Sequence, residues 1–120
     1  MKIEVSNGEI VDRATILMIK AEKLPEPYRA ELEAEMQALC NAMRGFGIDC
    51  SDEVTVELRR VNEGIWESIG RQEEILKFGK ADLEFAKVSA EVVRLNRKRY
   101  ELKRAIDEMT GSRTREFKQE

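Results

Sequence analysis

Apolar residues recur at alternating spacings of three and four along most of the chain, which is the pattern of amphipathic helices. Phe85, Val88, Val92 and Leu95 follow this spacing in the longest regular stretch. The pattern predicts four helices, over residues 7–24, 27–45, 51–78 and 80–110.

Capping and turn-forming residues mark where these helices begin and end. Ser6 and Glu9 fit a capping box, in which the Ser6 hydroxyl accepts from the Glu9 amide and the Glu9 carboxylate reaches back. Pro25 ends the first helix because proline cannot donate the helical hydrogen bond. Gly79 marks the turn between the last two helices, and Gly111 ends the last one.

These elements predict an all-α fold, an antiparallel helical bundle with a long C-terminal helical hairpin. Residues 2–5 alternate like a short extended segment, which needs a partner strand. We expect a single helical domain over residues 1–111 and a flexible tail over residues 112–120. The first helix is apolar on two sides and the hairpin ends project, so we expect a homo-oligomer joined through residues 2–24.

Composition narrows the choice of function. A chain of 120 residues, 42% apolar and 38% charged, has room for one domain with a modest core. The chain has no apolar run of membrane-spanning length and no opening signal segment, so we expect no membrane partner and a cytoplasmic location. It has no histidine, which removes Ser-His and Cys-His pairs and histidine metal sites. Cys40 and Cys50 are expected to remain thiols in a reducing cytoplasm.

The net charge of −3 is distributed unevenly, because residues 94–120 carry nine basic and five acidic side chains. A basic segment can displace counterions from nucleic acid. However, cations near the end of a helix also interact favourably with its macrodipole, and the segment lacks interleaved aromatic residues. We therefore expect no nucleic-acid partner.

Arg99 interrupts the apolar pattern of the fourth helix, between Leu95 and Leu102. If the hairpin turns near Gly79, residues whose numbers sum to about 159 face each other, which places Arg99 near Asn62 and Glu63. Three interpretations stay open. Arg99 pairs with Glu63, it faces a ligand, or its methylenes cover the core while the guanidinium reaches water.

Small and polar residues also interrupt the third helix. Gly64 and Ser68 form a low wall beside Trp66, which fits either close packing of a neighbouring helix or a flat ligand against the indole. Cationic donors in a polar pocket between the helices favour a carboxylate or phosphate ligand. The candidate ligand-binding residues are Asn62, Trp66, Asn96, Arg99 and Lys103.

Glu9 and Asp12 lie three apart on one face of the first helix, a spacing that can hold Mg²⁺. Glu9-Ile10-Val11-Asp12 resembles one half of the motif of all-helical nucleotide pyrophosphohydrolases. The second half of that motif is missing in the expected order, and the capping box already accounts for Glu9.

The segment from Lys2 to Lys20 resembles the start of domain-of-unknown-function family 6165, a family of bacterial and phage proteins. The resemblance is weakest over residues 25–60. It continues in order through Val61-Asn62, Trp66, Asn96-Arg97, Leu102-Lys103-Arg104, Ile106 and Gly111-Ser112. It implies no activity, since none is assigned to the family. It implies a recurring pattern beyond capping at Glu9, Asp12, Lys20, Asn62, Trp66, Asn96 and Lys103.

The sequence favours a non-enzymatic oligomeric binding protein that holds a small anion, bearing phosphate or carboxylate, or a protein partner. This interpretation needs only a pocket and a partner surface, and no cofactor. The alternative is a Mg²⁺-dependent, pyrophosphohydrolase-like enzyme that uses Glu9 and Asp12.

Overall fold

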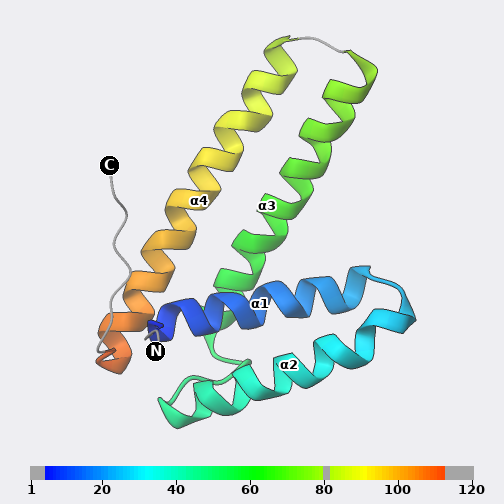
Figure 1. Cartoon of the computed structure of the whole chain (residues 1–120). Helices are drawn as coiled ribbons and strands as arrows, with labels where there is room; N and C mark the ends of the chain where they lie inside the picture. The colour runs from blue at the N-terminus through cyan, green and yellow to red at the C-terminus, as the bar shows by residue number, and fades with distance from the viewer. Residues whose placement is uncertain (1–4, 80–81, 113–120) are drawn as a thin grey trace.

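A computed structural model of the chain describes residues 5–79 and 82–112 (Figure 1). Within these residues the regular elements are four helices, and no strand is present. The helices are α1 (Asn7–Lys23), α2 (Glu26–Gly45), α3 (Glu53–Phe78) and α4 (Asp82–Thr110). The all-α prediction is confirmed, including the long C-terminal hairpin. The expected extended segment lies almost wholly outside the described residues, as does the expected tail beyond Ser112.

The bundle consists of two antiparallel hairpins that cross (Figure 1). One hairpin is α1 and α2, and the other is α3 and α4. Within the described residues, α1 packs against all three other helices, whereas α2 packs against α1 alone. Because α1 crosses α3 and α4 over one part of their length, the other part extends past it as a projecting arm.

The core lies where α1 crosses the α3/α4 hairpin. Its buried apolar residues are Val11, Ala14, Met43, Ile48, Leu58, Val61, Leu95, Leu102 and Ile106. The chain's own helices therefore cover the two apolar sides of α1, which were the reason for placing an oligomer interface on residues 2–24. The homo-oligomer stays a prediction. Because the apolar sides of α1 are covered within the chain, they no longer support an interface at residues 2–24.

The register of the α3/α4 hairpin agrees with the sequence prediction. A Cβ atom added at Gly64 would lie 3.1 Å from Leu95 Cδ1, so these two residues face each other. Farther along, Gln72 Nε2 donates to Ser89 Oγ at 2.9 Å. Gly64 thus serves close helix packing rather than a ligand. The hairpin closes after Gly79, whose φ of 64° is the left-handed conformation that glycine adopts without strain.

Among the described residues, no helix combines the length and the apolar character that crossing a membrane requires.

Candidate functional site

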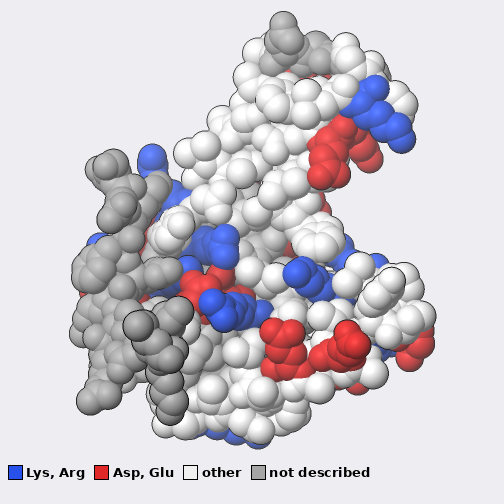
Figure 2. All heavy atoms as spheres, in the orientation of Figure 1, with Lys and Arg blue, Asp and Glu red and all other residues white. Residues whose placement is uncertain are grey.

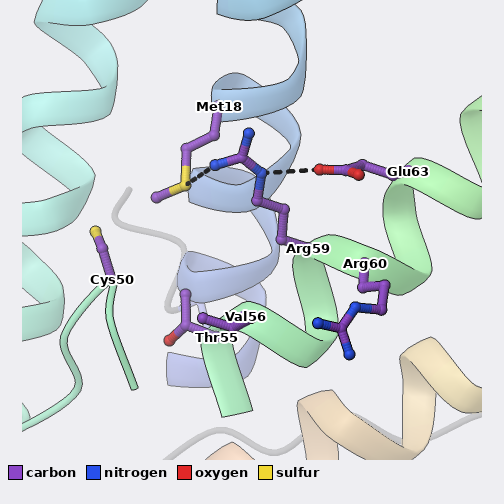
Figure 3. A pocket seen from close by; sticks show the side chains of 7 residues that line it. All are labelled: Met18, Cys50, Thr55, Val56, Arg59, Arg60 and Glu63. Carbon is purple, nitrogen blue, oxygen red and sulfur yellow. Dashed lines mark hydrogen bonds and ion pairs between the residues drawn. The ribbon is translucent and has the colours of Figure 1, made fainter. Parts of the chain in front are cut away.

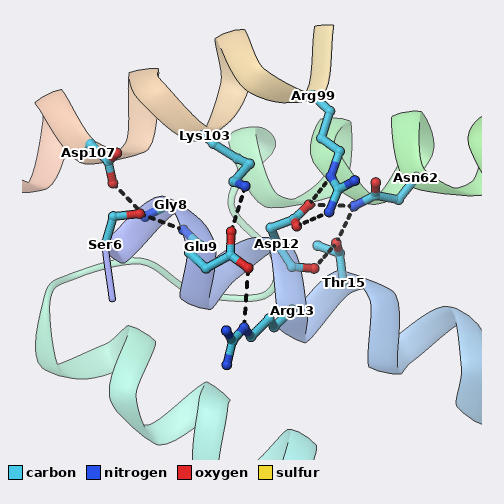
Figure 4. A network of polar contacts seen from close by, with 10 residues as sticks. All are labelled: Ser6, Gly8, Glu9, Asp12, Arg13, Thr15, Asn62, Arg99, Lys103 and Asp107. Atoms are coloured by element: carbon cyan, nitrogen blue, oxygen red, sulfur yellow. Dashed lines mark hydrogen bonds and ion pairs between the residues drawn. The ribbon is translucent and has the colours of Figure 1, made fainter. Parts of the chain in front are cut away.

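Ser6 begins α1 and caps it locally, as the sequence predicts. The Glu9 amide donates to Ser6 Oγ at 3.1 Å. The second half of the predicted capping box is wrong, because the Glu9 carboxylate turns to other partners (Figure 4). Its Oε2 lies 2.6 Å from Lys103 Nζ, and its Oε1 accepts from Arg13 Nε at 3.2 Å. A cation from α4 thus replaces the local backbone amide.

Residues from the end of α4 complete the cap. The Asn7 amide donates to Ser112 Oγ at 3.1 Å, and the Gly8 amide donates to Asp107 Oδ1 at 2.7 Å. These amides would otherwise have no helical partner. A Cβ atom at Gly8 would lie 2.3 Å from the Lys103 carbonyl oxygen, so only glycine permits this approach. Ser112, expected to begin the tail, is buried and belongs to the domain.

Asp12 is the centre of the polar cluster between α1, α3 and α4 (Figure 4). The residue is fully buried. Arg99 binds it in a bidentate manner, with Nε 2.9 Å from Oδ1 and Nη2 2.5 Å from Oδ2. Asn62 Nδ2 donates to Asp12 Oδ1 and to Thr15 Oγ1, both at 2.9 Å. The hydrogen bond to Asp12 raises the pKa of the Arg99 guanidinium, and this effect exceeds the opposing effect of burial.

Glu63, the counter-ion that hairpin register suggests for Arg99, is not its partner. Glu63 accepts from Arg59 Nε at 2.9 Å, and Arg59 also binds Glu22 on α1. Arg99 points instead to α1, which the hairpin register does not include. A signal was present in the sequence, because Asp12 and Thr15 occupy polar positions within the second apolar side of α1, at helical spacing from Ile19.

The structure brings only part of the predicted anion pocket together. Asn62, Arg99 and Lys103 meet at α1, but the two cations there face the carboxylates of Asp12 and Glu9. Trp66 lies on an exposed face of α3 and is 40% exposed. Asn96 is half-buried, and its side chain makes no hydrogen bond within the described part of the chain. The five residues therefore do not form one pocket.

The proposed Mg²⁺ ligands are likewise engaged. Asp12 faces Arg99, and Glu9 faces Lys103, whose side chain is 5% exposed. Over residues 5–79 and 82–112, no group of three or more acidic or cysteine side chains is arranged to hold a metal ion. Ion pairs and hydrogen bonds of Glu9 and Asp12 connect α1 with α3 and α4. Neither carboxylate faces an open site.

A second candidate site is a cavity of about 310 Å³ between α1 and the start of α3 (Figure 3). It is lined by Met18, Cys50, Thr55, Val56, Arg59, Arg60 and Glu63. The Sγ atoms of Cys50 and Cys40 are 3.1 Å apart, and both residues are free thiols. Burial, followed by the hydrogen bond with Cys40, raises the pKa of Cys50 to about 11. Sequence spacing gave no indication that the two thiols meet.

A third candidate site is a hollow of about 360 Å³ on α3, lined by Trp66, Ile69, Gly70 and Glu73. No atom lies within 4 Å of a Cβ added at Gly70, so packing within one chain does not require glycine here. This differs from Gly64, which contacts Leu95.

Replacing Arg99 by Met keeps the length of the side chain but leaves the Asp12 carboxylate buried without its cation. We expect the free energy of unfolding, measured by urea denaturation, to fall by about 3–5 kcal/mol. Adding Asp12→Asn should recover at least half of that loss, because the amide is neutral. Adding Glu63→Gln should recover nothing, and a rescue by that change would place the counter-ion on α3.

Gly8→Ala places a methyl group against the Lys103 carbonyl and forces α1 away from α4. We expect it to lower the free energy of unfolding by about 1–3 kcal/mol, the usual cost of overpacking. Gly45→Ala is the matched control, because no atom lies within 4 Å of its added Cβ. Equal stability of the two variants would show that α1 tolerates displacement.

Comparison with known proteins identifies a family for this chain. Residues 1–119 match the model of DUF6165, described as a family of unknown function. No curated protein and no solved structure matches the chain. The match covers essentially the whole sequence, so it includes every residue of the polar cluster around Asp12, from Ser6 to Ser112. This chain therefore belongs to DUF6165, a family of unknown function.

Proposed function

We propose that this chain is a non-enzymatic binding protein that works as a homo-oligomer, in which the projecting α3/α4 arm packs against a second copy. The arm is the part of the hairpin beyond α1, residues 66–78 of α3 and 83–94 of α4 (Figure 1). The observation that supports the proposal most is a set of large apolar side chains on the arm, each 40–69% exposed. They are Trp66, Ile69, Leu76, Phe78, Leu83 and Val93.

The exposed stripe on α3 continues the face that α1 covers. Asn62, which binds Asp12 of α1, is one helical turn before Trp66. Ile69 and Leu76 follow at helical spacing, all on the same side of α3. Where α1 ends its crossing, no helix of residues 5–79 and 82–112 covers this apolar face. In Figure 2 the arm presents a largely uncharged surface in this view.

The second helix of the arm carries an exposed apolar stripe of its own, on the side of α4 opposite the buried Val88. Leu83, Ala86, Ala90 and Val93 are spaced by three and four, and all four are exposed. A helical hairpin with apolar outer faces can complete a four-helix bundle with a second hairpin. Two copies related by a two-fold axis would bury the same surface on both subunits.

The charges around the stripe favour a copy of the same chain over a nucleic acid. Arg71 and Lys77 are exposed there together with Glu67 and Glu74, so both signs are interspersed. Such a surface can pair with itself when the helices run antiparallel, whereas phosphate binding needs clustered cations. The proposal therefore commits to a second copy as the occupant.

The hollow at Gly70 gives the surface a specific shape. A side chain from a facing helix packs into the space between four residues, as knobs fit holes in coiled coils. The hollow is bordered by Trp66 and Ile69, the two large apolar residues of the stripe nearest α1. A glycine inside a helix costs about 1 kcal/mol of stability relative to alanine. Space for a side chain of the facing helix would account for glycine at position 70.

Introducing charge into the apolar stripe of the arm should separate the two subunits of the dimer. We expect the wild-type chain to sediment as a dimer at micromolar concentration, and the double variant Ile69→Glu/Leu76→Glu to sediment as a folded monomer. Tyr28→Glu is the matched control, since Tyr28 is 58% exposed on α2, outside the arm, and this variant should remain a dimer. A wild-type monomer at tens of micromolar would overturn the proposal. Native mass spectrometry of the same sample would report any co-purified small anion.

Gly70→Ala should have opposite effects on the stability of the monomer and on the affinity of the two subunits for each other. The methyl group lies more than 4 Å from the described side chains and from the other described elements, so the helix should gain up to about 1 kcal/mol at concentrations where the protein is monomeric. In the dimer the same methyl group fills the hollow, and the dissociation constant from sedimentation should rise at least about tenfold. A more stable variant that associates as tightly as the wild type would place the interface elsewhere.

A further inference from the structure

The two cysteines of the chain are held close together although ten positions separate them. Cys40 lies on α2 and Cys50 in the connection to α3, and their Sγ atoms are 3.1 Å apart. In a disulfide this distance is about 2 Å, so a displacement of roughly 1 Å separates the thiol pair from a bond. The two sulfurs are therefore within reach of each other in the folded chain.

The turn that carries Cys50 is well defined by hydrogen bonds. The Cys50 amide donates to Asp49 Oδ1 at 2.8 Å, and the Asp49 amide donates to Asp52 Oδ2 at 2.9 Å. Thr55 Oγ1 donates to the Asp49 carbonyl at 2.9 Å. Ile48 anchors the preceding part of the loop in the core, where it is 5% exposed. The short distance between the sulfurs is therefore a property of the folded turn.

A small reagent can reach Cys50 from the cavity between α1 and α3. Cys50 lines this cavity of about 310 Å³, together with Met18 and Arg59 (Figure 3). Both cysteines are half-buried, neither sealed in the core nor fully exposed. A cavity of this size admits a small molecule to the Cys50 thiol.

We propose that Cys40 and Cys50 form a thiol–disulfide site, which a low-molecular-weight disulfide oxidises. One cysteine thiolate attacks a sulfur of the small disulfide, whose S–S bond breaks and releases one small thiolate. The second cysteine loses its proton, attacks the mixed disulfide and releases the second small thiolate. Two protein S–H bonds are replaced by one S–S bond, and the small disulfide takes up two electrons and two protons as two thiols.

The bond would close a ring over residues 40–50, joining α2 to the turn before α3. Met43 and Ile48, both core residues, lie inside this ring. Closing a loop of this length restricts the unfolded chain and shifts the folding equilibrium about a hundredfold toward the native state. Oxidation would thus fix the α1/α2 layer on the hairpin without adding a contact.

The test equilibrates the full chain with mixtures of reduced and oxidised glutathione, once in buffer and once in concentrated urea. Acid quenching and intact mass then give the fraction of each species. Because the raised pKa of Cys50 slows exchange at neutral pH, the reactions run at mildly alkaline pH until oxidation and reduction give the same ratio. We expect one product that has lost two hydrogens, with an effective thiol concentration about a hundredfold higher in buffer than in urea.

Cys40→Ser serves as the control, since it leaves Cys50 alone and should accumulate a glutathione adduct. Three results would overturn the proposal for the wild-type chain. They are a glutathione adduct as the main product, a disulfide between two chains, and an effective concentration in buffer no higher than in urea.

Discussion

The fold depends on a buried carboxylate in the middle of its first helix. Asp12 has no exposed surface, and a lone carboxylate there would be strongly destabilising. Arg99 of α4 and Asn62 of α3 are therefore both required at this point, and their hydrogen bonds fix the depth and rotation of α1 against the hairpin. Apolar packing alone tolerates sliding between helices, whereas a bidentate ion pair accepts one geometry.

The polar cluster also explains why the two halves of the α3/α4 hairpin differ. Where α1 crosses the hairpin, it covers α3 and α4, and residues such as Leu102 and Ile106 are buried. Beyond the crossing, the described part of the hairpin buries an inner seam around Val88 and Ile75, and large apolar side chains such as Leu76 and Leu83 stay exposed among charged ones on its outer faces. The position of Asp12 thus determines where the covered part ends and the exposed arm begins.

Periodicity predicted the helices well, because each apolar stripe is a local property of the chain. It also predicted the register of the α3/α4 hairpin, which the contact of Gly64 with Leu95 supports. It did not predict the partner of Arg99. Spacing places Arg99 on a face of α4, but the crossing of α1 over that face arises from contacts between residues far apart in sequence. For the same reason the spacing places Trp66, one turn from the buried Asn62, in a polar pocket with Arg99, whereas Trp66 lies just beyond the part that α1 covers.

The cap of α1 has a consequence for how the chain is made. Three successive amides at its start are satisfied by side chains, and two of these, Asp107 and Ser112, belong to the last turn of α4 and the residues after it. A ribosome adds about 5–20 residues per second, so α1 waits roughly 5–20 s for those partners. Throughout that interval its apolar sides and the Asp12 carboxylate have no complement on α4. The final position of α1 is therefore reached only after the end of α4 has been made, and until then its unpaired face is exposed to misassociation.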